Sequence, residues 1–160
     1  TGSAHVQGIE VETTLRPVEG LLIDASASYL DFDYYELLPG TLVEKSDRSP
    51  YSPKWKWSVG AQYEVPIGAG SLTPRVDASY QSDSYSLAAN DPLNLLRAYT
   101  LVNARLTWRS PDRDWSVSGE VTNLTNKYYF LSKQVPSNAG YINGQPGAPR
   151  RYGVVVRKNF

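Results

Sequence analysis

The chain of 160 residues has no cysteine, a single histidine and no long hydrophobic run. Without cysteine it can form neither disulfides nor thiolate metal sites. The lone His5 cannot build a histidine-based metal site or a catalytic triad. The longest apolar runs, such as residues 21–23, are only a few residues long. A transmembrane helix needs about 20 apolar residues, so these runs exclude one. A formal net charge of 0 gives no sign of nucleic-acid binding.

The sequence is rich in amphipathic aromatic residues, and apolar and polar residues alternate along it with a period of two. Twelve tyrosines and four tryptophans stand against three phenylalanines, and such rings are favoured where one end is apolar and the other is wet. Apolar and polar residues alternate along segment after segment, which predicts β-strands. The seven predicted strands span residues 8–16, 21–30, 54–65, 72–82, 98–108, 115–124 and 150–160.

The connections between the predicted strands alternate in length. Short connections span 17–20, 66–71 and 109–114, and long ones span about 31–53, 83–97 and 125–149. Transmembrane barrels have short turns at one end of the sheet and long loops at the other. The sequence therefore predicts an all-β fold, an antiparallel up-and-down sheet without crossovers. His5 is expected in a loop before the first strand.

The alternation predicts one apolar face and one charged face. Small residues such as Ala61 and Gly119 fill the middle of the apolar face, and Lys158 is its only charged residue. A close-packed soluble β-sandwich needs large aliphatic side chains there, whereas lipid fills any gap beside a small one. The pattern favours a membrane barrel over the sandwich. On the other face, acidic and basic residues are expected to pair in hydrogen-bonded ladders.

Aromatic residues gather at both ends of the apolar face. Interfacial aromatic residues form two girdles around transmembrane barrels, and we predict the same role for these side chains. The predicted girdle residues are Tyr29, Trp55, Trp57, Tyr80 and Tyr152 near the long loops, and Tyr63, Trp108, Trp115 and Phe160 near the short turns.

The predicted sheet is expected to be part of something larger. Most of the segments are as long as the roughly 9–11 residues that a tilted spanning strand needs. Seven strands do not match the even strand number of single-chain bacterial barrels, and an open edge in lipid would leave backbone groups unpaired. We therefore expect residues 1–160 to be one segment of a barrel, with earlier strands preceding Thr1.

Four stretches resemble one known family, the TonB-dependent receptors of the bacterial outer membrane. Residues 8–12 (GIEVE) are similar to that family's strand opening, and 52–55 (SPKW) to its loop-to-strand return. Residues 123–129 (NLTNKYY) resemble the end of its penultimate strand. Residues 149–154 (PRRYGV) and the closing Phe160 resemble its final strand. Lys158 departs from the apolar alternation of that ending.

The resemblance implies that the chain is the C-terminal part of the receptor barrel, its last seven strands. It implies uptake of a scarce ligand, siderophore-bound iron or similar, with the short turns in the periplasm and the long loops outside. The implied partners are outer-membrane lipid, a plug domain and the remaining barrel strands, the TonB complex through the absent N-terminal part, and the barrel-assembly machinery through the C-terminal strand. No enzyme activity and no cofactor are expected.

The long loops are the expected place of ligand capture, because aromatic and amide side chains on loops suit binding. Two alternatives remain open: a passive porin-like or structural outer-membrane barrel, and a soluble lipocalin-like carrier. The candidate ligand-binding residues are Tyr34, Tyr35, Tyr51, Tyr85, Tyr129, Phe130, Tyr141 and Asn143.

Overall fold

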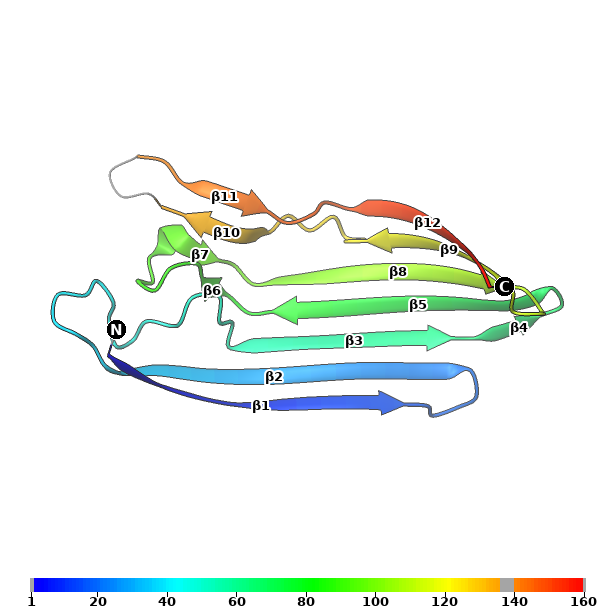
Figure 1. The fold of residues 1–160 in the computed structure, drawn as a ribbon, viewed down its shortest axis with the longest axis horizontal. Helices are drawn as coiled ribbons and strands as arrows, with labels where there is room; N and C mark the ends of the chain where they lie inside the picture. The colour runs from blue at the N-terminus through cyan, green and yellow to red at the C-terminus, as the bar shows by residue number, and fades with distance from the viewer. Residues whose placement is uncertain (1, 136–139, 160) are drawn as a thin grey trace.

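The computed structural model describes residues 2–135 and 140–159, and its main feature is one long antiparallel sheet (Figure 1). Along its main path the strands follow one another in chain order without a crossover, so the predicted meander is confirmed. A short strand, β4 (Val65–Ile67), pairs with β5 beside this path. The path runs through β1 (Ser3–Leu15), β2 (Leu21–Glu36), β3 (Trp55–Tyr63), β5 (Gly70–Gln81), β8 (Tyr99–Arg109), β9 (Trp115–Thr122) and β12 (Arg151–Lys158).

The predicted strand 54–65 is divided at Glu64 into β3 and β4. The register is unchanged across the division, with Gln62 opposite Arg75 and Val65 opposite Leu72. This register places Pro74 opposite the end of β3. Proline has no N–H to donate to a ladder, so the pairing is interrupted there without a bulge.

The two ends of the sheet differ as the connection lengths predict. The short turns and the end of β12 lie together at one end (Figure 1), called here the short-turn end. The tight turn before β5 depends on Gly70, whose φ is +116°. A Cβ atom at this position would lie 1.9 Å from the carbonyl oxygen of Arg109, so only glycine fits.

The long connections form the opposite end, called the long-loop end, and they contain structure that alternation did not predict. The connection 82–98 contains a one-turn helix, η1 (Pro92–Asn94), between β6 (Ser84–Tyr85) and β7 (Leu95–Leu96), which pair with each other. The connection 123–150 contains a second hairpin, β10 (Phe130–Gln134) with β11 (Asn143–Pro146). Among the described residues, no helix has the length and apolar character needed to cross a membrane.

The structure corrects the expected ends of the first two strands. His5 lies within β1, opposite Asp33, and not in a loop before it. Tyr34 and Tyr35 lie in β2, so the first long connection begins after Glu36 and not at residue 31. The reason is an inversion of polarity along an unbroken register. Beyond Gly8 and Leu30 the face that carried apolar residues carries Gln7, Asp31 and Asp33, and the opposite face carries Val6, Phe32 and Tyr34.

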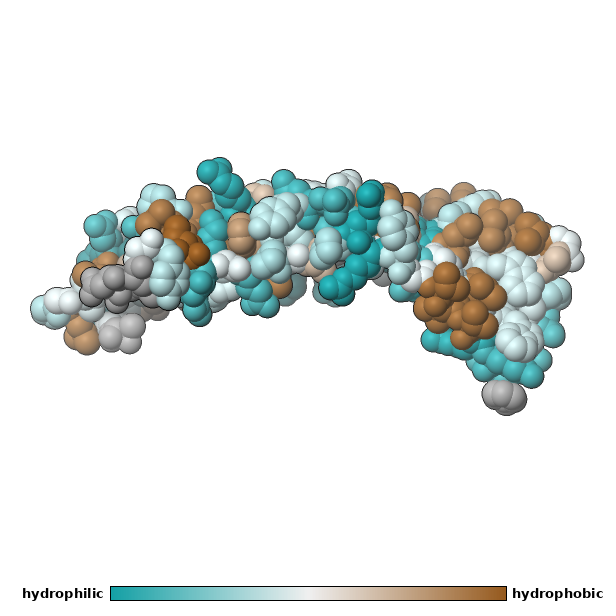
Figure 2. Space-filling view, turned by 90° about the horizontal axis from the view of Figure 1, so that it is seen from above, coloured by the Kyte–Doolittle hydropathy of each residue, from teal (hydrophilic) through white to brown (hydrophobic). Residues whose placement is uncertain are grey.

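Apart from the far ends of β1 and β2, the sheet keeps the predicted apolar face. Val59, Ala78 and Val102 form one row across β3, β5 and β8, for example. These side chains cover no core: Ile9 is 69% and Val154 75% exposed, and Leu96 is the only fully buried hydrophobic residue in the described ranges. Figure 2 shows the sheet in profile as a thin arched layer with apolar residues gathered toward the short-turn end.

We expect arginine in the middle of the apolar face to destabilise the full-length barrel by about 2–4 kcal/mol, the cost of that charge at a bilayer midplane. Suitable changes are Val59→Arg, Ala78→Arg and Val102→Arg. The neighbouring row on the other face supplies matched controls, Ser58→Arg and Ser79→Arg, which should cost much less. Refolding titrations in lipid vesicles measure both, and equal costs would contradict the orientation of the sheet.

Candidate functional site

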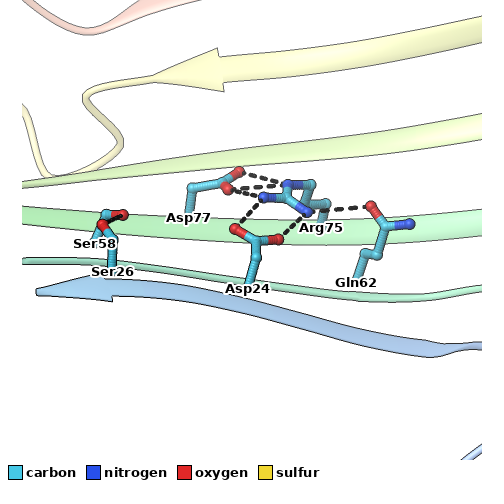
Figure 3. A network of polar contacts seen from close by, with 6 residues as sticks. All are labelled: Asp24, Ser26, Ser58, Gln62, Arg75 and Asp77. Atoms are coloured by element: carbon cyan, nitrogen blue, oxygen red, sulfur yellow. Dashed lines mark hydrogen bonds and ion pairs between the residues drawn. The ribbon is translucent and has the colours of Figure 1, made fainter. Parts of the chain in front are cut away.

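The polar face of the sheet is organised around Arg75 on β5. Its guanidinium bridges Asp24 on β2 at 2.9 Å and Asp77 on its own strand at 2.9 Å, and it donates to Gln62 on β3 at 3.2 Å (Figure 3). Gly60 makes room for this cluster, since a Cβ atom there would lie 2.3 Å from the Arg75 Nη2 atom. The network ties three strands together on a face that lipid does not need to cover.

Other polar side chains of the same face also pair between neighbouring strands. Arg105 bridges Glu120 at 2.8 Å. Hydroxyl pairs join Ser26 with Ser58 at 2.8 Å and Thr107 with Ser118 at 2.9 Å. These groups therefore pair across the strands as the alternation led us to expect, which suits an inner wall that meets water or other polar surfaces.

Beside the Arg75 network the polar face is hollowed. The hollow has a volume of about 370 Å³, and serine side chains from β2, β3 and β5 form much of its floor. Glu10, Lys56 and Gln81 stand around it. Because serine is small and can both donate and accept hydrogen bonds, the hollow can hold water or polar groups of a partner.

At the long-loop end, Arg48 joins the first long connection to the second. Its backbone N–H donates to the Asn90 side chain at 2.6 Å, and its guanidinium bridges Asp83 at 2.8 Å. The guanidinium also lies 5.0 Å from the centre of the Tyr85 ring. Burial acts to lower the pKa of Arg48, but the hydrogen bond and charge of Asp83, with a smaller effect of Tyr85, raise it overall.

The third long connection is held to the same assembly. The Tyr51 hydroxyl lies 3.1 Å from the Ser132 hydroxyl, and the Tyr51 N–H donates to the Tyr85 carbonyl at 2.8 Å. The Lys133 ammonium donates to the Leu95 carbonyl at 2.8 Å. Residues from all three long connections thus form one hydrogen-bonded assembly, which we call the loop junction.

Asn123 anchors the start of the third long connection. It is 4% exposed and has a φ of +50°, a conformation that asparagine tolerates better than most residues. Its side-chain amide donates to the carbonyls of Lys127 at 2.9 Å and Ala148 at 3.0 Å, and its side-chain oxygen accepts from the Lys127 N–H at 2.7 Å. The 123–129 motif is therefore a turn that fixes both ends of this connection.

The candidate ligand-binding residues do not form a single cluster. Tyr51 and Tyr85 meet in the loop junction, and the Tyr129 ring lies 4.3 Å from that of Tyr99. Tyr34 and Phe32 pack edge to face at 4.8 Å. Of the other candidates, Phe130 packs on Tyr128 and beside Gly144, and its ring centre lies 5.2 Å from the Lys133 ammonium of the junction. Asn143 is exposed on β11, and Tyr35 and Tyr141 are 77% and 56% exposed.

Several residues of this region are not among the candidates from the sequence. Arg48 and Asp83 form an ion pair between two loops, which leaves no periodic signal in the sequence. Phe32 lies beyond the predicted strand end at residue 30, although the change in alternation phase after Leu30 identifies it. The ligand-contacting role of the eight candidate residues stays a prediction.

Most of the predicted girdle residues make contacts typical of interfacial aromatics. Tyr29 lies 4.7 Å from Trp55, and Trp57 stacks on Tyr80 at 5.6 Å. The remaining members lie at the strand ends: Trp108 donates to the Ala69 carbonyl, Trp115 faces the Lys158 ammonium, Tyr152 faces Arg150, and Tyr63 lies beside Gly20. Phe160 lies outside the described residues. Their membrane role stays a prediction from the sequence.

Metal binding by the protein itself has no support in the part of the chain that the structure describes. Within residues 2–135 and 140–159 there is no group of three or more histidine, aspartate or glutamate side chains that could hold a metal ion.

Several solved structures share this fold. The ferric yersiniabactin uptake receptor FyuA of Yersinia pestis matches with a TM-score of 0.85 and 19% identity, over 98% of this chain and 24% of that one. The ferric preacinetobactin receptor BauA of Acinetobacter baumannii gives 0.77 and 24%, over 98% and 22%. The ferripyoverdine receptor of Pseudomonas aeruginosa gives 0.74 and 20%, over 98% and 20%. The chain therefore spans a quarter or less of their length.

An open antiparallel meander with an exposed apolar face and a paired polar face defines a segment of a β-barrel wall. The family described as TonB dependent receptor-like, beta-barrel, matches residues 1–124. The chain belongs to this family of receptors, and its place is the bacterial outer membrane. The soluble-carrier alternative is thereby removed.

Replacing Arg48 by alanine should loosen the loop junction. The guanidinium bonds to Asp83 would be lost, and hydrogen bonds to charged groups contribute about 1.5–3 kcal/mol. We expect hydrogen exchange at the Tyr51 amide to accelerate about tenfold or more. Lys45→Ala is the matched control, an exposed cation in the same connection. Equal exchange in the two variants would show that Arg48 does not order the junction.

Proposed function

We propose that the chain forms part of the wall of a receptor that takes up a scarce ligand, an iron–siderophore complex or one like it, with energy delivered by TonB. The observation that supports this best is the asymmetry of the two ends. The long-loop end holds three connections in one junction rich in aromatic and amide groups, whereas the short-turn end consists of tight reversals. Capture from one side of a membrane requires such a difference.

The proposal extends to a complete barrel with further strands. β1 and β12 each pair on one side only within the described sheet. In lipid every backbone polar group must be satisfied, and an unpaired edge costs several kcal/mol per group. Strands of the parent protein would therefore cover both edges. We further propose that residues 1–160 are the C-terminal segment of that barrel.

The remaining partners follow from the two faces. The apolar face would contact outer-membrane lipid, and the paired polar face with its hollow would contact a plug domain, through which TonB acts. The C-terminal strand would be the contact for the barrel-assembly machinery. We infer no catalysis and no bound cofactor: Arg75 and Arg105 of the wall are paired with carboxylates, and the one histidine is on an exposed strand position opposite Asp33.

Energy dependence separates this proposal from a passive porin-like barrel. Cells that carry the parent protein should accumulate a radiolabelled ferric siderophore from a panel of catecholate, hydroxamate and carboxylate types, and uptake should stop when the inner membrane is de-energised. A plug moved by TonB requires that coupling, while an open pore does not. Passage that continues without energy would establish the passive barrel instead.

Shortening the first long connection should abolish uptake, because the segment that positions Arg48 in the loop junction would be lost. A deletion of residues 38–46 is the direct test. The matched change at the other end is Gly68→Ala with Ala69→Ser, since a Cβ atom at Gly68 meets nothing within 4 Å; it should leave uptake intact. Equal loss of uptake in both proteins, with equal amounts in the membrane, would contradict a directional role of the long loops.

A further inference from the structure

Two arginine side chains on the polar face near the short-turn end have no partner among the described residues. Arg109 on β8 and Arg157 on β12 both lie opposite Ser116 on β9, so the three positions form one row across the sheet. Both arginines are exposed. Neither side chain has a hydrogen bond or ion pair with any residue in 2–135 or 140–159.

This row differs from the rest of the polar face. Arg75 is held by two carboxylates, and Arg105 is held by Glu120 at 2.8 Å. On β8, β9 and β12, Glu120 is the only carboxylate of that face, against the arginines 105, 109, 151 and 157. An excess of positive charge on one part of a wall attracts anions and raises their local concentration.

The geometry of the row suits one anionic group. Neighbouring strands are about 4.8 Å apart, so the backbones at Arg109 and Arg157 are separated by about 10 Å, with the short Ser116 side chain between them. Two arginine side chains can converge across that distance. A guanidinium offers a planar pair of donors that matches a carboxylate or a phosphate, and the Ser116 hydroxyl can add a third donor.

Nearby carboxylates do not occupy the row. In the adjacent turn, the Asp112 carboxylate accepts from the Ser110 hydroxyl and from the Asp114 N–H, which together lower the pKa of Asp112. Asp114 forms no ion pair with a described residue, and its carbonyl accepts from the Asn159 N–H at 2.8 Å. The turn is thus held by its own groups, and the arginine row remains open.

We propose that Arg109, Ser116 and Arg157 form an oxyanion-binding site on the inner wall near the short-turn end, for a carboxylate or a phosphate group. The site rests on the proposed function only in requiring a closed barrel whose polar face points inward. The anion has two possible sources: a carboxylate of the parent protein itself, from an interior segment or the strand next to β12, or a free anion inside the barrel.

The test is the melting temperature of the purified full-length protein in detergent, during a phosphate titration at constant ionic strength. The variant is Arg109→Gln with Arg157→Gln. Its control, Arg16→Gln with Arg113→Gln, removes the same charge from the short turns. If the site binds free anions, phosphate should give a saturable rise of about 2 °C in the parent and the control, and none in the variant.

If a carboxylate of the protein fills the site, phosphate should not change the melting temperature of the parent. The melting temperature of the variant should then lie several degrees below that of the control. Should the variant not fold, Arg109→Lys with Arg157→Lys keeps the charge but loses the planar donor pairs, and it should show a weaker form of the same difference. Variant and control that melt together and respond alike to phosphate would overturn the site. Uptake is not measured, so this result is independent of the transport test.

Discussion

The two faces of the sheet depend on one constraint, the antiparallel register that is kept from Ala4 in β1 through to β12. A shift by one residue would move each side chain to the opposite face, and lipid offers no hydrogen bonds to rescue a misplaced strand. The register holds apolar rows such as Val59, Ala78 and Val102 on one side. The same register brings Asp24, Arg75 and Gln62 together on the other, so the apolar face and the polar network have a common origin.

The central sheet could be predicted from sequence because its signal is local and repeated. Alternation and connection length were enough to obtain the meander and the two faces. Prediction failed where the environment changes along a strand. Beyond Leu30, Asp31 and Asp33 take the place of apolar residues on their face of β2, so the alternation inverts. If the alternation is assumed to keep one phase, the predicted second strand ends at Leu30. This is six residues before the end of β2 at Glu36.

The loop junction could not be predicted for a different reason. Its bonds join residues far apart in the chain, such as Arg48 with Asp83 and Tyr51 with Ser132. A single sequence shows no pattern for such pairs, because neither partner occupies a periodic position. Aromatic content did point to Tyr51 and Tyr85, but only the structure shows that they meet, and that Tyr35 and Tyr141 remain apart.

Pro74 fixes a limit on how deep the short-turn end can lie in the bilayer. Because proline has no N–H, the carbonyl group facing it on β3 receives no ladder bond at that level. In the hydrocarbon centre such an unpaired carbonyl would cost several kcal/mol, whereas water at the interface satisfies it at little cost. Tyr63 at the end of β3 is a residue suited to the interface. The level of Pro74 and Tyr63 therefore marks the depth at which interfacial water must still reach the barrel wall.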